Sequence, residues 1–121
     1  MKKIAGVYSI LLGVSIMGLW SMLLSAGNVP ELKTALISIA FHMAAETIMG
    51  ILLLISGVAL IKDSKNGVSL FVLSNGLVIY SVVNSAGYYG EKGQWIMVAM
   101  FMAILFMSSF LTYGLLKKSE L

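Results

Sequence analysis

Residues 34–61 read TALISIAFHMAAETIMGILLLISGVALI, an apolar stretch in which Glu46 is the one charged side chain. A helix of about 20 apolar residues, rising about 1.5 Å per residue, crosses the ~30 Å hydrocarbon core of a bilayer. Three further stretches, 4–30, 66–90 and 93–116, are also apolar and carry no charge. Because a backbone in lipid must satisfy its own hydrogen bonds, helices are the expected form. The sequence therefore predicts an all-α integral membrane protein with four helices.

Composition supports the same class. The chain has 121 residues, of which 60% are hydrophobic and 11% charged, with a mean hydropathy of +0.99. Soluble domains carry about 25% charged residues. We expect one four-helix domain over residues 1–121, with no room for an extramembrane domain. The absence of cysteine excludes disulfides, thiolate metal sites and Fe–S clusters in this chain.

The expected helices span residues 4–26, 34–61, 67–89 and 94–116. The connections between them are short and contain Gly, Pro, Asn and Asp, which are turn-forming residues. Short connections place consecutive helices next to each other in opposite directions, so the sequence predicts an antiparallel, up-down-up-down bundle. The second helix is long for one crossing, so we expect it to be tilted or to have its first turn in the interface.

The lysines predict the topology. Cytoplasmic connections of membrane proteins carry an excess of lysine and arginine. Both termini and the second connection are lysine-rich, whereas each of the other two connections holds one lysine beside a glutamate. We therefore expect a multi-pass protein of the cell membrane with both termini in the cytoplasm, and the net charge of +3 does not indicate a nucleic-acid partner. The lysines of the first group are Lys2, Lys3, Lys62, Lys65, Lys117 and Lys118, and those of the second are Lys33 and Lys92.

Small residues at helical spacing predict where the helices pack closely, because they let two backbones approach. One stripe lies on the first helix and two lie on the second. They are Gly6, Ser9 and Gly13 on the first, and Gly50 with Gly57 and Ala40 with Ala44 on the second.

Glu46 and His42 form the candidate functional site. Counted from Thr34, Glu46 lies about 18 Å along its helix, near the expected midplane of the membrane. An ionised acid at that depth costs roughly 3 kcal/mol or more, so such acids face the bundle interior or a cavity. His42, the one histidine, precedes Glu46 by four residues and therefore shares its helix face. The two side chains could form an ion pair or a neutral hydrogen-bonded pair.

Three roles for this pair remain open. It could join helices by hydrogen bonds to neighbouring serines and asparagines, bind a proton or cation, or bind a quinone-like or other amphipathic small molecule. Two ligands do not complete a coordination sphere, so no metal site is predicted.

Polar residues at a similar depth could complete a small pocket. Tyr80 and Asn84 share one face of the third helix, and we expect that face to point inward against the second helix. Asn75 lies nine residues before Asn84, about 180° around the helix, and is expected to face elsewhere. Ser15 and Ser108 on the first and fourth helices reach roughly the depth of the acid and are included as candidate ligand-binding residues.

Glu46, Gly50, Leu54 and Gly57 form a Glu-x3-Gly-x3-Leu-x2-Gly pattern that resembles the DoxX/MauE-like superfamily of small four-helix membrane proteins. Some members of that superfamily are subunits of quinone-linked oxidoreductases or accessories to other enzymes, so the resemblance implies a similar role. Residues 80–98 also resemble a stretch found in small uncharacterised prokaryotic membrane proteins, which implies no activity.

The sequence thus predicts a small binding or accessory subunit with a polar intramembrane site around Glu46 and His42. The alternative is a proton- or cation-linked transporter or channel that functions as an oligomer. Catalysis is not expected, because outside this pair the chain lacks an acid–base couple, a nucleophile motif and a metal triad. Expected partners are the lipid bilayer, further copies of the chain or a larger membrane enzyme, and the small ligand. No cofactor is assigned.

Overall fold

A computed structural model describes residues 2–27, 29 and 31–118. Four long helices, each long and apolar enough to cross a membrane, make up most of this part of the chain. They are α1 (Lys2–Ser25), α3 (Leu36–Ile61), α4 (Gly67–Glu91) and α5 (Trp95–Lys118), and a single short turn of helix, α2 (Glu31–Thr34), precedes α3. The predicted all-α, four-helix architecture is confirmed.

The observed bounds differ from the predicted ones mainly before α3. The expected helix from Thr34 is interrupted at Ala35, whose backbone (φ −146°, ψ 59°) is not helical. The first turn expected at the start of that helix is therefore a separate element, α2, and α3 starts at Leu36. Compared with the predictions, α1 begins two residues earlier, and α4 and α5 end two residues later. The end of α1 and the start of α5 lie one residue inside the predicted bounds, and α4 begins as predicted.

Among the described residues, each of the three connections contains one with positive φ: Gly27 (71°), Asp63 (54°) and Gly93 (73°). After α3 and α4 the backbone closes with the same pair of bonds. After α3, Asp63 N–H donates to Leu60 O at 3.1 Å and Ser64 N–H to Ala59 O at 2.8 Å. After α4, Gly93 N–H donates to Gly90 O and Gln94 N–H to Tyr89 O, both at 3.0 Å. This is the Schellman ending, in which a left-handed residue after the helix satisfies the last carbonyls. The short antiparallel connections follow from it.

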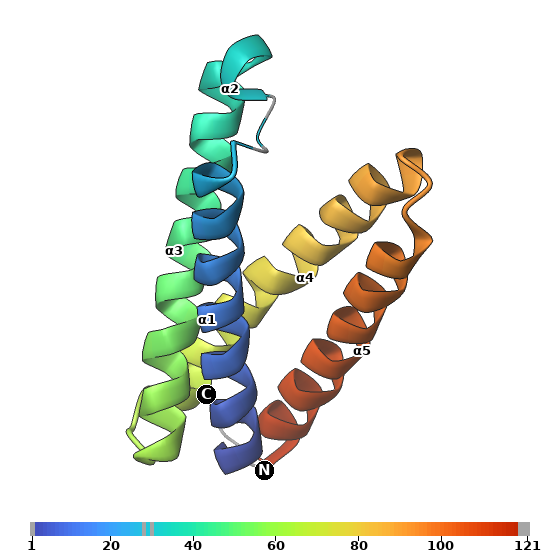
Figure 1. Ribbon diagram of the computed structural model, residues 1–121. Helices are drawn as coiled ribbons and strands as arrows, with labels where there is room; N and C mark the ends of the chain where they lie inside the picture. Colours follow the sequence, from blue (N-terminus) through green and yellow to red (C-terminus); the bar gives the residue numbers. More distant parts are fainter. Residues whose placement is uncertain (1, 28, 30, 119–121) are drawn as a thin grey trace.

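Figure 1 shows the helices running alternately up and down, with α1 against α3 and α4 against α5. The two pairs meet through α3 and α4 and diverge away from the termini. We call one end of the bundle the terminal end: it holds the start of α1, the end of α5 and the 62–66 connection. We call the opposite end, which holds α2 and the 92–94 connection, the distal end.

The terminal end has a core to which all four long helices contribute. Its fully or almost fully buried side chains are Ala5, Leu60, Val68, Phe71, Leu111 and Leu115. A second cluster, built around Met49, Leu53, Val78 and Val82, lies further toward the distal end. Beyond this second cluster the helix pairs separate, and that separation positions the candidate site.

The predicted glycine stripes are confirmed as the contact between α1 and α3. A Cβ atom added to Gly6 would lie 2.9 Å from Gly57 O, and one added to Gly57 would lie 2.8 Å from Gly6 O. A Cβ on Gly13 would lie 3.0 Å from Gly50 O. The backbones therefore approach so closely that only glycine fits at Gly6 and Gly57.

The third predicted stripe is wrong. Ala40 and Ala44 are exposed on the surface of the structure rather than packed against a neighbouring helix. Both lie on the first half of α3, where the inward face is occupied by Ile39, Glu46 and Met49 instead.

Candidate functional site

A cleft of about 500 Å³ lies between the two helix pairs toward the distal end. Its walls come from α1, the first half of α3, the second half of α4 and the start of α5, and most of its lining is apolar. Met49, Val78 and Val82 belong both to the second core cluster and to the cleft, so they form its floor. This volume falls within the roughly 300–1,000 Å³ that is usual for small-molecule sites.

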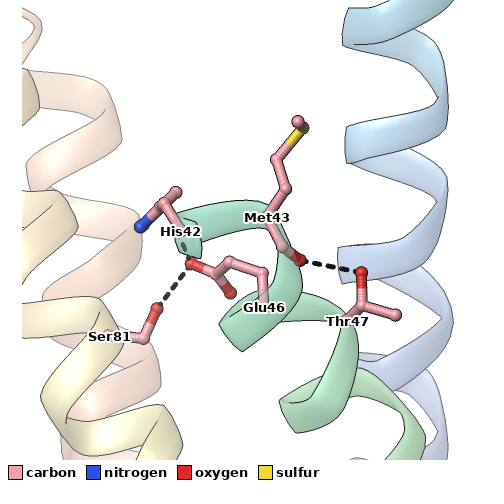
Figure 2. Close-up of polar contacts among 5 residues, drawn as sticks. All are labelled: His42, Met43, Glu46, Thr47 and Ser81. Carbon is pink, nitrogen blue, oxygen red and sulfur yellow. Dashed lines mark hydrogen bonds and ion pairs between the residues drawn. The ribbon is translucent and has the colours of Figure 1, made fainter. Parts of the chain in front are cut away.

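Glu46 is the acid of this cleft. Its carboxyl group is largely buried, with 8% of the residue exposed, and it lies ten residues after the start of α3. Ser81 on α4 donates a hydrogen bond from its hydroxyl to Oε1 at 2.9 Å, and His42 places Nε2 3.5 Å from the same oxygen (Figure 2). One carboxylate oxygen therefore receives both contacts, one of them from another helix.

His42 contacts Glu46 from one turn earlier in α3, so the predicted meeting of the two side chains is confirmed. Its side chain is 42% exposed and lines the cleft. The imidazole meets the ring of Trp20 on α1 edge-on, with 5.6 Å between centroids. Trp20 therefore limits how the imidazole can turn, and it brings α1 into contact with the site.

Asn84 is the third predicted residue that the structure brings to the cleft, at its edge on α4. The other three predicted residues lie elsewhere. Ser15 is exposed and donates to Leu11 O of its own helix at 2.7 Å. Ser108 is buried toward the terminal end, hydrogen-bonded to Tyr8, and Tyr80 is 75% exposed on the outer surface of α4.

The predicted rotation of α4 is therefore wrong. Asn75, expected to face away, is fully buried and donates from Nδ2 to Phe71 O at 3.1 Å, whereas Tyr80 points outward. The depth assigned to Tyr80 was sound, because its neighbour Ser81 meets Glu46. One residue of sequence is 100° around a helix, so an error of one position moves a side chain from the interior to the surface.

Sequence reasoning missed Ser81 and the aromatic walls. Serine is common in apolar helices, so Ser81 alone carries little information. A usable signal is its spacing from Ser74 and Ser85, because positions seven and four residues apart share a helix face. The aromatic rings lie on opposite sides of the cleft. Trp20 comes from α1, and the α4–α5 pair contributes Tyr89 and Phe101, whose stacked rings have centroids 5.7 Å apart.

A chain of serine hydroxyls joins three helices below the cleft. Ser56 Oγ on α3 lies 3.0 Å from Ser9 Oγ on α1 and 3.1 Å from Ser74 Oγ on α4, and all three residues are fully buried. Ser9 also donates to Leu53 O at 2.6 Å. These hydroxyls and the terminal-end core fill the space between the helices on the terminal side of the cleft, so the cleft opens toward the distal end.

The arrangement offers a carboxylate acceptor and an imidazole in a largely apolar, partly open cleft. Such a site can bind a donor group or take up and release a proton. Within the described residues, no three His, Cys, Asp or Glu side chains come together in a way that could hold a metal ion.

Comparison with curated proteins and with solved structures gave no match. The whole chain, residues 1–121, matches a family described as a domain of unknown function, DUF8058. The chain, with its four apolar helices and its acid-containing cleft, belongs to this DUF8058 family.

Proposed function

We propose that the protein is a small binding or accessory subunit of the membrane, with its ligand site at Glu46 and His42. The observation that carries this proposal is a buried carboxylate beside the floor of a cleft of ligand size. Ionisable groups inside membrane-spanning segments are costly, and those found there mark sites more often than they mark packing.

A purely structural role accounts for part of this geometry. The Ser81–Glu46 hydrogen bond joins α4 to α3, as expected for a polar pair that holds helices together. It does not account for the cleft, because side chains that serve only packing are enclosed by their neighbours. The ligand role accounts for both the contact and the open volume.

A proton- or cation-linked transporter is the second candidate. It is favoured by the pairing of an ionisable imidazole with a carboxylate in a cleft that opens toward one end. Transport requires the closed terminal end to open in a second state. Flux of protons or cations in proteoliposomes, abolished by Glu46→Gln, would favour this candidate over the binding protein.

The lysine distribution supports a position in the cell membrane with both termini in the cytoplasm, so the distal end and its cleft would face outward. Single cysteines at Ser64 and Lys92 test this arrangement, since the natural chain has none. We expect impermeant reagents to label Lys92→Cys, but not Ser64→Cys, in intact cells. Labelling of both from the same side would contradict the topology.

The resemblance to DoxX/MauE-like proteins supports an accessory role beside a larger prokaryotic membrane enzyme. Mild-detergent purification followed by identification of co-purifying proteins tests for that enzyme and for further copies of this chain. A chain that elutes alone and retains a small molecule would favour the independent binding protein.

Native mass spectrometry of the purified protein tests the site directly. We expect a retained small molecule in the natural protein, its loss in Glu46→Gln, and its retention in Tyr80→Phe, because Tyr80 lies outside the cleft. His42→Ala should shift the pH dependence of binding. A Glu46→Gln variant that folds and retains the same molecule would refute the site.

A further inference from the structure

The second oxygen of the Glu46 carboxyl group, Oε2, restricts which chemical groups a ligand can place beside it. Figure 2 shows Ser81 and His42 both directed at Oε1, with no partner drawn to the other oxygen. Among the residues that the structure describes, none donates to Oε2. Because Glu46 lines the cleft, Oε2 is the acceptor that the site offers to a ligand.

A ligand that meets Oε2 must bring its own donor. The two side-chain groups that contact the carboxyl group, the Ser81 hydroxyl and Nε2 of His42, are both directed at Oε1. With the carboxyl group ionised, a ligand with carbonyl oxygens alone would place acceptor against acceptor at Oε2. This geometry disfavours a quinone and favours a molecule with an N–H or O–H group.

The charges around the cleft favour a positively charged donor. Among the described residues that line it, Glu46 is the acid and Lys92 is the lysine; Lys92 follows the floor residue Val82 by ten positions, roughly 15 Å along α4 toward the distal end. Lys92 Nζ contacts Tyr88, at 2.7 Å from its hydroxyl and 4.2 Å from its ring centroid. An ammonium at Oε2 would offset the cost of a buried carboxylate, and charge-assisted bonds of this kind are about twice as strong as neutral ones.

The walls suit an aromatic or bulky apolar body attached to that ammonium. Trp20 lies on one side and the stacked Tyr89–Phe101 pair on the other. Aromatic faces attract cations as well as apolar groups, most strongly away from water. The carboxylate thus suits a cationic N–H group, and the rings suit an apolar body attached to it.

We propose that the cleft binds a lipophilic organic ammonium, with its N–H group at Glu46 Oε2 and its apolar body between Trp20 and the Tyr89–Phe101 pair. This inference rests on the proposed binding function and specifies its ligand class.

Three probes with the same ring and different head groups test the inference: anthracenylmethylamine, anthracenemethanol and anthracenecarboxylate. Energy transfer from Trp20 to anthracene reports binding in a Trp95→Phe background, since the chain has two tryptophans and Trp95 lies outside this cleft. We expect the amine to bind at least about tenfold more tightly than the alcohol, and the carboxylate to bind most weakly.

Glu46→Gln should remove the preference for the amine over the alcohol, while Tyr80→Phe should retain it. Circular dichroism and size-exclusion elution establish that each variant is folded. If Glu46→Gln does not fold, Glu46→Asp serves in its place: the shorter acid should keep the preference but weaken it.

The outcomes separate the two proposals. Three results would overturn the ammonium inference and leave the binding cleft in place. They are equal binding of the amine and the alcohol by the natural protein, tighter binding of the carboxylate than of the amine, and an amine preference that persists in folded Glu46→Gln. Absence of transfer to all three probes would overturn both.

Discussion

The terminal and distal ends of this bundle are built from similarly apolar helices and differ in how those helices meet. At the terminal end, glycines let α1 and α3 approach at backbone distance, and buried serine hydroxyls connect α1, α3 and α4. At the distal end, bulky aromatic side chains and a carboxylate lie between helix pairs that have separated. If the helices lie in lipid, as we propose, there is no hydrophobic drive for them to associate, and close packing and interhelical hydrogen bonds decide which part closes. We therefore expect stability to depend mainly on the closely packed terminal half, while the cleft lies in the distal half.

The glycine contact should be the most sensitive part of the closed half. In Gly57→Ala the new methyl group would lie 2.6 Å from Ile10 Cγ1 and 2.8 Å from Gly6 O. Because a backbone atom cannot turn aside, we expect unfolding free energy in detergent to fall by about 1–3 kcal/mol.

Gly76→Ala is the matched control, because a Cβ there has nothing within 4 Å. The two variants should separate clearly in denaturant titrations followed by circular dichroism. Equal stability would mean that α1 and α3 are not in backbone contact.

Cysteine labelling compares the openness of the two halves. Ser85 lines the cleft, whereas Ser74 is fully buried in the serine chain. A small maleimide should modify Ser85→Cys at least about tenfold faster than Ser74→Cys, since reaction requires access to the thiolate.

Both variants should label at the same rate after denaturation, which controls for intrinsic reactivity. Equal rates in the folded protein would show that the distal half is closed, and the proposed ligand site would lose its support.

The serine chain should contribute less than the glycine contact. Ser56→Ala removes the hydroxyl that bridges Ser9 and Ser74. We expect a loss of about 1 kcal/mol in unfolding free energy, in the range of single interhelical hydrogen bonds. Ser109→Ala, on the exposed surface of α5, should change stability less; the reverse order would mean that these hydroxyls do not hold the helices together.

The smallest effect is expected at the surface of the terminal end. Lys2 Nζ lies 2.6 Å from Asp63 Oδ1, and this hydrogen bond, with the charge of Lys2, lowers the pKa of the Asp63 carboxyl. A depressed acid pKa contributes stability above the ordinary value of about 4, which is lost as the pH falls through the folded-state pKa. Both groups are exposed, so the contribution is small.

Asp63→Asn should therefore lower the melting temperature slightly at pH 7, and the difference should disappear at a pH low enough to protonate Asp63 in the folded protein. Asparagine tolerates the positive φ at this position, so the turn itself is retained. A constant difference at both pH values would assign the effect to the turn rather than to the ion pair.

Much of the fold follows from local sequence. Apolar length predicts the four helices, and turn residues such as Gly27 and Gly93 predict where they end. The spacing of Gly6, Gly13, Gly50 and Gly57 correctly predicts a close contact, because a missing side chain has the same consequence wherever the helix packs.

The site was predictable only in part. The four-residue spacing of His42 and Glu46 determines that they share a face, since both lie on one helix. The partners from other helices depend on how each helix is rotated about its axis. A helix that is apolar on all sides gives little sign of its inward face, so the sequence predicts Tyr80 inside and does not identify Ser81.

Four apolar helices, most of their ends, the glycine contact and an acid one turn after a histidine could all be predicted from the sequence. The tertiary structure alone decided that Ser81 meets Glu46, that Asn75 rather than Tyr80 faces inward, and that a cleft remains between the helix pairs. The two groups of features differ in how far apart along the chain the interacting residues lie. Helix formation and turn geometry depend on neighbours within a few residues, whereas rotation and separation depend on side chains far apart along the chain.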